Sequence, residues 1–157
     1  MNWLPVLIWL GVIFVGSTDL MSAEHASRFI VPFLRWLKPD ISPERLASIH
    51  VIVRKCAHVG EYAILALLLL RAAIFIPNRN LKRSVLVLCV SVWIACVFVA
   101  ATDEFHQTFV ASRGASVGDI IVDGSGAILG LLIGMMLVMS RSIMVQNSAC
   151  RPMSSCL

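Results

Sequence analysis

Charged residues are scarce in this chain: Asp, Glu, Lys and Arg make up 14% of its 157 residues, whereas soluble domains carry about 25%. Acidic residues are the scarcer sign, with only 9 against 13 basic residues. Apolar residues fill the difference, at 59% of the sequence and a mean hydropathy of +0.87. This composition excludes an ordinary soluble domain and indicates an integral membrane protein.

Three further absences narrow the class of protein. No Lys or Arg precedes the first apolar segment and no clear small-x-small cleavage site follows it, which favours an uncleaved helix over a secretory signal. The 5 cysteines show no zinc-ligand spacing, so we predict no metal site and no cofactor. The net charge of +4 is spread along the chain without a basic patch, so no nucleic-acid partner is expected.

Four apolar segments have the length of a membrane span, which needs roughly 17 to 25 residues to cross about 30 Å of hydrocarbon. They cover about residues 3–18, 57–76, 84–102 and 120–139, the first being the shortest. Their lengths are helical and they lack the period-2 alternation of a barrel. We predict an all-α fold: a four-helix transmembrane bundle with a short amphipathic helical connector between the first and second spans.

The connector, residues 19–56, is too short for a core of its own but carries apolar residues at helical spacing. We predict two short amphipathic helices on the membrane face, separated at Pro39 and Pro43, with Ser42 and Pro43 starting the second. They would form either a lid over a site or a passive linker. The transmembrane domain thus covers residues 1–140, and residues 141–157 are predicted to be a flexible C-terminal tail.

Four spans place both termini on the same side of the membrane. Basic residues are divided almost evenly between the two faces, so the short basic loop with Arg79, Lys82 and Arg83 decides the orientation. Short basic loops resist translocation, and we therefore expect both termini in the cytoplasm.

Polar residues gather at those ends of three spans that are predicted to lie on the same side of the membrane. At the start of the second span, Lys55, His58 and Tyr62 fall within an arc of roughly 60° on a helix, with Glu61 beside them. At the end of the third, Asp103 and Gln107 share a face and Glu104 lies next to it. Ionisable groups inside a membrane are rare and normally mark a function, although anchoring and helix packing are the alternative for each residue alone.

The fourth span carries a stripe in which Asp119 and Asp123 are followed by small residues. Gly126, Gly130 and Gly134 continue the spacing of three or four residues. Small residues at this spacing let another helix approach closely, so the stripe predicts a packing face that carries both carboxylates away from lipid. The same glycines are a candidate surface for a homo-oligomer.

These residues resemble a known pattern, that of the VanZ-like membrane proteins. The resemblance covers nearly the whole chain and is carried by Lys55, His58, Tyr62, Leu65, Asp103, Glu104, Gln107, Arg113, Ser116, Asp119, Asp123, Gly126 and Gly130. Two departures are visible: Asp123 stands where Asn is usual, and Ala111-Ser112 precedes Arg113 where Pro-Gly is common. The resemblance implies a bacterial cytoplasmic (inner) membrane protein that acts at the cell-envelope surface. The namesake of the family is associated with resistance to the lipoglycopeptide teicoplanin, and its biochemical activity is not established.

The leading hypothesis is an extracytoplasmic-side polar pocket that binds or processes an anionic lipid or cell-envelope precursor headgroup. Arg113 and Lys55 would contact phosphate, and His58, Gln107 and Tyr62 would orient the ligand. The carboxylates would fix these cations or hold a divalent ion. The expected binding residues are Lys55, His58, Tyr62, Asp103, Glu104, Gln107, Arg113, Asp119 and Asp123.

Three other functions stay open. An enzyme would use His58 as base or nucleophile, oriented by Glu104 or Asp119, in phosphoryl or acyl transfer on a lipid. A proton-coupled transporter would relay protons through the carboxylates, but no polar path to the opposite face is visible. A structural scaffold would use the polar residues only to lock its helices together.

Overall fold

The fold is entirely helical across the residues that the computed structural model describes, which are 2–18, 31–74, 85–109 and 116–149. For residues 141–149 it describes the backbone alone. The long helices are α1 (Leu4–Gly16), α3 (Pro43–Ile74), α4 (Val85–Gln107) and α5 (Val117–Ala149), and residues 31–37 are also helical. The predicted all-α fold is confirmed.

Of the four predicted spans, three correspond to helices of membrane-crossing length. α3, α4 and α5 are long and apolar enough to cross a membrane. α1 has 13 residues, or roughly 20 Å of helix, which is shorter than the hydrocarbon core. It packs along α3 through the buried Val6 and Ile13. The indole Nε1–H of Trp9, also on α1, donates to the backbone carbonyl of Glu61 on α3 at 2.9 Å.

The connector differs from its prediction. The helix beginning at Pro43 does not end before the second span but continues through it, giving one helix of 32 residues. Its predicted start is correct: the Ser42 hydroxyl accepts the Arg45 N–H at 3.4 Å, and Pro43 takes the first helical position, where its missing N–H does no harm. No proline or glycine lies between Pro43 and Val59 to break the helix.

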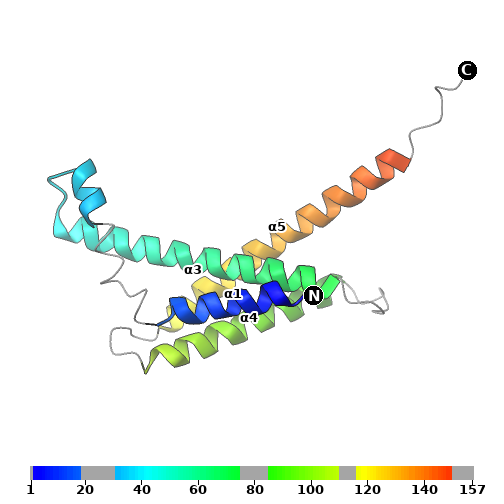
Figure 1. The fold of residues 1–157 in the computed structure, drawn as a ribbon, viewed down its shortest axis with the longest axis horizontal. Helices are drawn as coiled ribbons and strands as arrows, with labels where there is room; N and C mark the ends of the chain where they lie inside the picture. Colours follow the sequence, from blue (N-terminus) through cyan, green and yellow to red (C-terminus); the bar gives the residue numbers. More distant parts are fainter. Residues whose placement is uncertain (1, 19–30, 75–84, 110–115, 150–157) are drawn as a thin grey trace, which may run out of the picture.

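The fourth span is also longer than the predicted 120–139. α5 begins at Val117 and its helical backbone runs into the predicted tail as far as Ala149, while 150–157 lie outside the described residues. Its C-terminal part extends away from the other helices (Figure 1).

α3 occupies the centre of the bundle and contacts α1, α4 and α5, most extensively α5. α3 and α5 run in the same direction, with α4 returning between them in sequence (Figure 1). A Cβ added to Gly126 would lie 2.5 Å from the Val59 carbonyl oxygen, and one added to Gly130 would lie 2.8 Å from the Cα of Ala63. The glycine stripe therefore lets two helix backbones touch, as its spacing predicts.

A homo-oligomer through the same glycines would require α3 to leave them, so that part of the prediction remains a proposal that one chain does not test.

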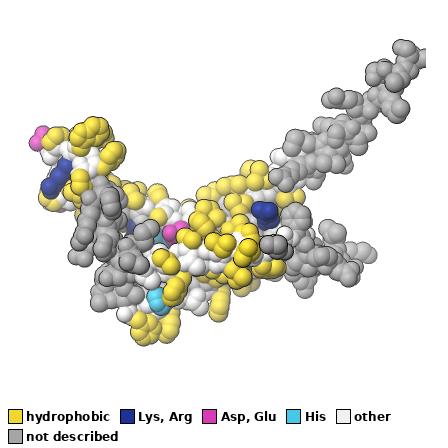
Figure 2. Space-filling view, viewed as in Figure 1, with side chains coloured by type: hydrophobic (Ala, Val, Ile, Leu, Met, Phe, Trp, Pro, Cys, Tyr) yellow, Lys and Arg dark blue, Asp and Glu magenta, His cyan; other side chains and the backbone are white. Residues whose placement is uncertain are grey.

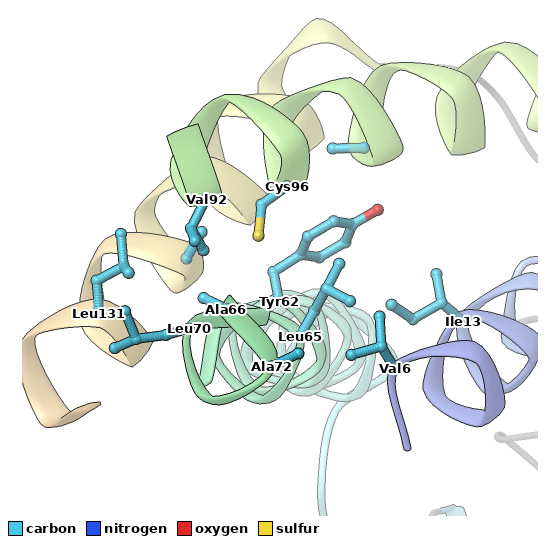
Figure 3. Packing of buried hydrophobic residues seen from close by; sticks show 12 residues of the cluster. Val6, Ile13, Tyr62, Leu65, Ala66, Leu70, Ala72, Val92, Cys96 and Leu131 are labelled. Atoms are coloured by element: carbon cyan, nitrogen blue, oxygen red, sulfur yellow. The ribbon is translucent and has the colours of Figure 1, made fainter. Parts of the chain in front are cut away.

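The apolar interior is formed by Val6, Ile13, Tyr62, Leu65, Ala66, Leu70, Ala72, Val92, Cys96, Ala100, Ala127 and Leu131 (Figure 3). Large apolar side chains also cover the visible outer face of the helices, as expected of a surface that faces lipid (Figure 2).

Candidate functional site at the helix ends

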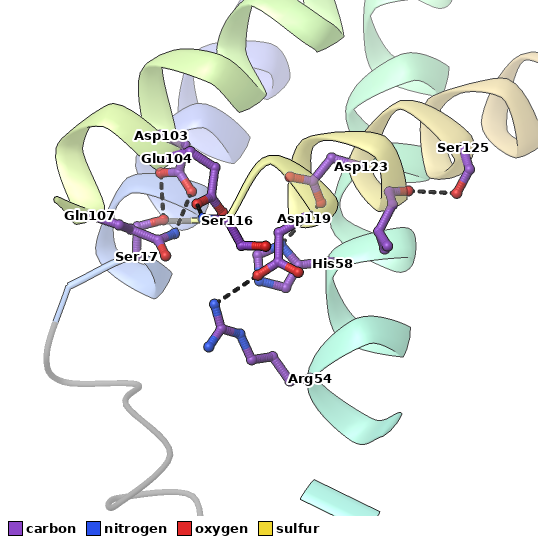
Figure 4. Close-up of polar contacts among 11 residues, drawn as sticks. Ser17, Arg54, His58, Asp103, Glu104, Gln107, Ser116, Asp119, Asp123 and Ser125 are labelled. Carbon is purple, nitrogen blue, oxygen red and sulfur yellow. Dashed lines mark hydrogen bonds and ion pairs between the residues drawn. The ribbon is translucent and has the colours of Figure 1, made fainter. Parts of the chain in front are cut away.

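Polar side chains from four helices meet at one end of the bundle, where α1 and α4 end and α5 begins (Figures 1 and 4). α3 passes this end with His58, which lies 16 residues, or roughly 24 Å, before the end of its helix at Ile74. That distance approaches the thickness of a hydrocarbon core. The cluster is therefore set at one end of the part of α3 that is long and apolar enough to cross a membrane.

Asp103 joins α1 to α4. The Ser17 hydroxyl donates to Asp103 Oδ1, and the Gln107 amide Nε2 donates to Asp103 Oδ2 at 2.9 Å. Gln107 follows Asp103 by one helical turn, so the second bond lies along the face that the sequence predicted. All three residues are buried, and both oxygens of the carboxylate have donors.

Glu104 joins the end of α4 to the start of α5. Its Oε2 accepts the backbone N–H of Ser116 at 2.8 Å, just before the first residue of α5. A carboxylate is favoured here because the first N–H groups of a helix have no partner within the helix. Glu104 is only 3% exposed, so this contact lies inside the protein.

His58 and Asp123 form the most buried cross-helix pair. His58 Nδ1 lies 3.0 Å from Asp123 Oδ1, and the two residues are 8% and 1% exposed. Asp123 therefore orients the imidazole, in place of the expected Glu104 or Asp119. A carboxylate on Nδ1 fixes the ring and determines which nitrogen is left for other partners.

One turn further toward the end, Arg54 Nη2 lies 3.0 Å from Asp119 Oδ2, with side chains 41% and 15% exposed. Both cross-helix pairs are separated by 65 residues, so they repeat one turn apart on parallel helices. Arg54 was missing from the predicted site. It lies four residues before His58, so it shares the helical face of His58.

Apart from Tyr62, the predicted binding residues divide into three groups. His58, Asp103, Glu104, Gln107, Asp119 and Asp123 are brought together. Lys55 is exposed, and the contacts described in this cluster use its neighbour Arg54. Arg113 lies outside the described residues. Ser17, and Ser116 which the sequence marked only through the resemblance, supply donors to the buried carboxylates.

Tyr62 is fully buried one turn after His58, and its ring packs among the apolar residues of Figure 3. Its hydroxyl has no hydrogen-bond partner among the described residues, although the charges of Asp123 and Asp103 act on it. Three further atoms of the cluster share that condition: Glu104 Oε1, Gln107 Oε1 and Asp123 Oδ2. Buried polar atoms are normally satisfied, so four such atoms in one cluster require an explanation.

Negative groups outnumber positive ones here. Asp119 has Arg54 and Asp123 has His58, but the donors to Asp103 and Glu104 among the described residues are a hydroxyl, an amide and a backbone N–H. The four carboxylates are close enough to influence one another. Across the described parts of the chain, no three His, Cys, Asp or Glu side chains are arranged to hold a metal ion.

Fold and site together define an all-α membrane protein with a polar cluster at one end of its helices. It belongs to the VanZ/LLP1 family, whose sequence model matches residues 2–139. No curated protein and no solved structure matches the chain.

Proposed function

We propose that this protein binds the polar headgroup of a membrane lipid or lipid-linked cell-envelope precursor at the polar cluster, on the extracytoplasmic side of the bacterial cytoplasmic membrane. The cluster lies at one end of the bundle, and in our proposal this end is at the membrane surface, where lipid headgroups are found. With both termini in the cytoplasm, as proposed from the basic loop, that face is the outer one.

A single observation carries the proposal: four buried polar atoms lack partners within the described parts of the chain, although the surrounding network joins four helices. A scaffold that only locked its helices together would be expected to satisfy its own groups, because each unsatisfied buried atom costs about 1 to 3 kcal/mol. A ligand that supplies the missing hydrogen bonds accounts for these unpartnered atoms. This argument favours a binding site over a structural scaffold.

Arg54 is the cation best placed for an anionic part of the headgroup. Its side chain is 41% exposed and held at the end of the cluster by Asp119. A guanidinium can bind that carboxylate with one edge and a phosphate with another. Lys55 and Arg113 remain proposed contributors to the same phosphate contact.

The enzyme alternative has one specific observation in its favour. A histidine held by a buried carboxylate through Nδ1 is the arrangement that lets an imidazole accept a proton at Nε2. Phosphoryl or acyl transfer on the bound headgroup would then use His58 as base or nucleophile, with Asp123 as its positioning residue.

The test compares single substitutions that retain shape: His58→Gln, Glu104→Gln and Gln107→Leu, with Ser125→Ala as control. Ser125 is exposed on α5 and donates only to the carbonyl of Val122. Purified proteins in nanodiscs are examined for co-purifying lipid by native mass spectrometry, and cells are scored for teicoplanin susceptibility. Loss of bound lipid with normal membrane accumulation supports the site, whereas loss of the protein itself supports the scaffold.

If the three variants retain the lipids of the unmodified protein, the binding proposal is wrong. If His58→Gln alone retains lipid but loses a headgroup-modifying activity measured on the unmodified protein, the enzyme alternative is favoured.

A further inference from the structure

We infer that the buried part of this cluster receives a primary ammonium group of the headgroup, and that the ligand is an amino-bearing lipid or precursor instead of a purely anionic one. The inference rests on the proposed function and specifies its ligand. It departs from the anionic headgroup expected from the sequence.

The first step is the hydrogen-bonding capacity of the unpartnered atoms. Glu104 Oε1 and Asp123 Oδ2 belong to carboxylates, and Gln107 Oε1 is an amide oxygen. In its ionised form a carboxylate accepts only, and an amide oxygen never donates. With both carboxylates ionised, the missing partner has to bring hydrogen-bond donors, which the phosphodiester anion of a lipid headgroup does not have.

Gln107 makes this step independent of the acidic residues. It is a neutral side chain with 0% exposure, and its amide nitrogen is already used by Asp103. The orientation of the amide follows from that bond, because the nitrogen must be the atom facing the carboxylate. Its oxygen is thereby left as an acceptor inside the protein, at the same end of α4 as Glu104.

The second step is charge. Among the described residues the donors to Asp103 and Glu104 are all neutral, and no Lys or Arg side chain forms an ion pair with either carboxylate. Burying an ionised carboxylate without a cation is strongly unfavourable. A ligand that carries both donors and positive charge corrects both deficits together, and a primary ammonium has three donors and one charge.

A hydroxyl group would supply donors without the charge, and a quaternary ammonium would supply charge without donors. A divalent ion would need several oxygen ligands at one point. The described residues contain no such group of three acidic, His or Cys side chains. Tyr62, one turn after His58, has an unpartnered hydroxyl that is a further hydrogen-bond acceptor in this part of α3.

The experiment measures lipid preference of the unmodified full-length protein in nanodiscs by native mass spectrometry. Three headgroups on the same acyl chains separate the requirements: phosphatidylethanolamine has a primary ammonium, phosphatidylcholine has a charge without N–H donors, and phosphatidylglycerol has hydroxyls and a net negative charge. We expect phosphatidylethanolamine to be retained about tenfold or more over phosphatidylcholine and over phosphatidylglycerol. This is the ratio of affinities that the loss of one charged hydrogen bond produces.

The matched variant is Glu104→Gln, which removes the charge and keeps an oxygen for the Ser116 N–H. It should reduce the preference for ethanolamine over glycerol by about tenfold. Ser125→Ala should leave it unchanged. Should Glu104→Gln fail to accumulate, the comparison of headgroups on the unmodified protein still decides the question.

Equal retention of phosphatidylethanolamine and phosphatidylcholine, or stronger retention of phosphatidylglycerol, would show that the site does not select a primary ammonium group. If glycerol lipid is bound and then lost in Gln107→Leu, the site binds a headgroup and only the ammonium is wrong. If all three lipids are retained equally and no cluster variant changes this, the proposed function fails as well.

Discussion

His58 Nδ1 lies 3.0 Å from Asp123 Oδ1, and this pair joins the middle of α3 to the second turn of α5 inside the bundle. Around it the two parallel helices meet in steps of one turn. Arg54 faces Asp119 before the pair, and Val59 and Ala63 touch Gly126 and Gly130 after it. The polar cluster and the closest helix contact are thus parts of one interface.

Replacing Asp123 distinguishes charge from hydrogen bonding in this pair. Asp123→Asn keeps an oxygen for His58 Nδ1 and is expected to change the free energy of unfolding by about 1 kcal/mol or less. Asp123→Ala leaves His58 buried without its partner and should lower that free energy by roughly 3 kcal/mol. Thermal unfolding in detergent measures both. Equal losses for the two variants would show that the hydrogen bond does not stabilise the fold.

Among the described glycines, Gly130 should be the one whose replacement by alanine is most destabilising. The new Cβ would lie 2.8 Å from the Ala63 Cα and must push α3 away from α5. The loss of packing should lower the free energy of unfolding by about 2 kcal/mol or more. Membrane accumulation and thermal unfolding provide the measurement.

Gly60→Ala is the matched control, because a Cβ there meets no atom within 4 Å and alanine favours a helix. It should leave stability unchanged or raise it slightly. A destabilisation equal to that of Gly130→Ala would mean that close packing is not the reason for the glycine stripe.

Periodicity predicted which residues share a face of one helix, and the glycine spacing predicted a close helix contact, but neither predicted which polar side chains pair across helices. The turn spacing predicted that Asp103 and Gln107 share a face, and they bond directly. Nothing in the sequence determines how far α5 is shifted along α3. That shift decides that Asp123, and not Asp119, reaches His58. Arg54 was missed for a related reason: Arg54 and Lys55 both lie within a turn of His58, and only the position of the neighbouring helix shows that Asp119 faces Arg54.

Helix ends were predicted less well than helix centres. Hydropathy marks the part of a helix that is compatible with lipid, but a helix continues through polar residues while its backbone bonds are satisfied. α3 and α5 therefore extend well beyond the apolar segments. α1 shows the opposite case, since its 13 residues are apolar but too few to cross alone.

Ser17→Ala should loosen α1 without unfolding the bundle. The Ser17 hydroxyl donates to Asp103 and links the end of α1 to α4. Its loss should lower stability by about 1 kcal/mol and increase hydrogen exchange of the α1 backbone. Ser140→Ala is the control, since that hydroxyl donates only to the carbonyl of Met136 in its own helix. Unchanged exchange in α1 would contradict the linking role of Ser17.

The orientation can be tested with Cys56, which is exposed on α3 two residues before His58. With both termini in the cytoplasm, this thiol lies on the outer side, and a membrane-impermeant maleimide should label it in intact cells. Cys56→Ser should abolish the labelling. Labelling that persists in Cys56→Ser and is lost when Cys150 and Cys156 are replaced would place the termini outside.

Arg54 and Lys55 offer the sharpest test of the site, because they are adjacent cations with different surroundings. Arg54→Gln removes the guanidinium held by Asp119, whereas Lys55→Gln removes an exposed charge at the neighbouring position. The ion pair between Arg54 and Asp119 is partly exposed, so its loss in Arg54→Gln should change the free energy of unfolding by about 1 kcal/mol or less. Lys55→Gln breaks no described ion pair and should change it no more. Binding should respond unequally: Arg54→Gln is expected to weaken retention of phosphate-bearing lipids about tenfold, because a charged hydrogen bond to phosphate is lost. Lys55→Gln should weaken it less than threefold. Native mass spectrometry of both variants in the same nanodiscs gives the comparison. The reverse order would assign the phosphate to Lys55, as the sequence first indicated, and would leave Arg54 with a purely structural role on Asp119.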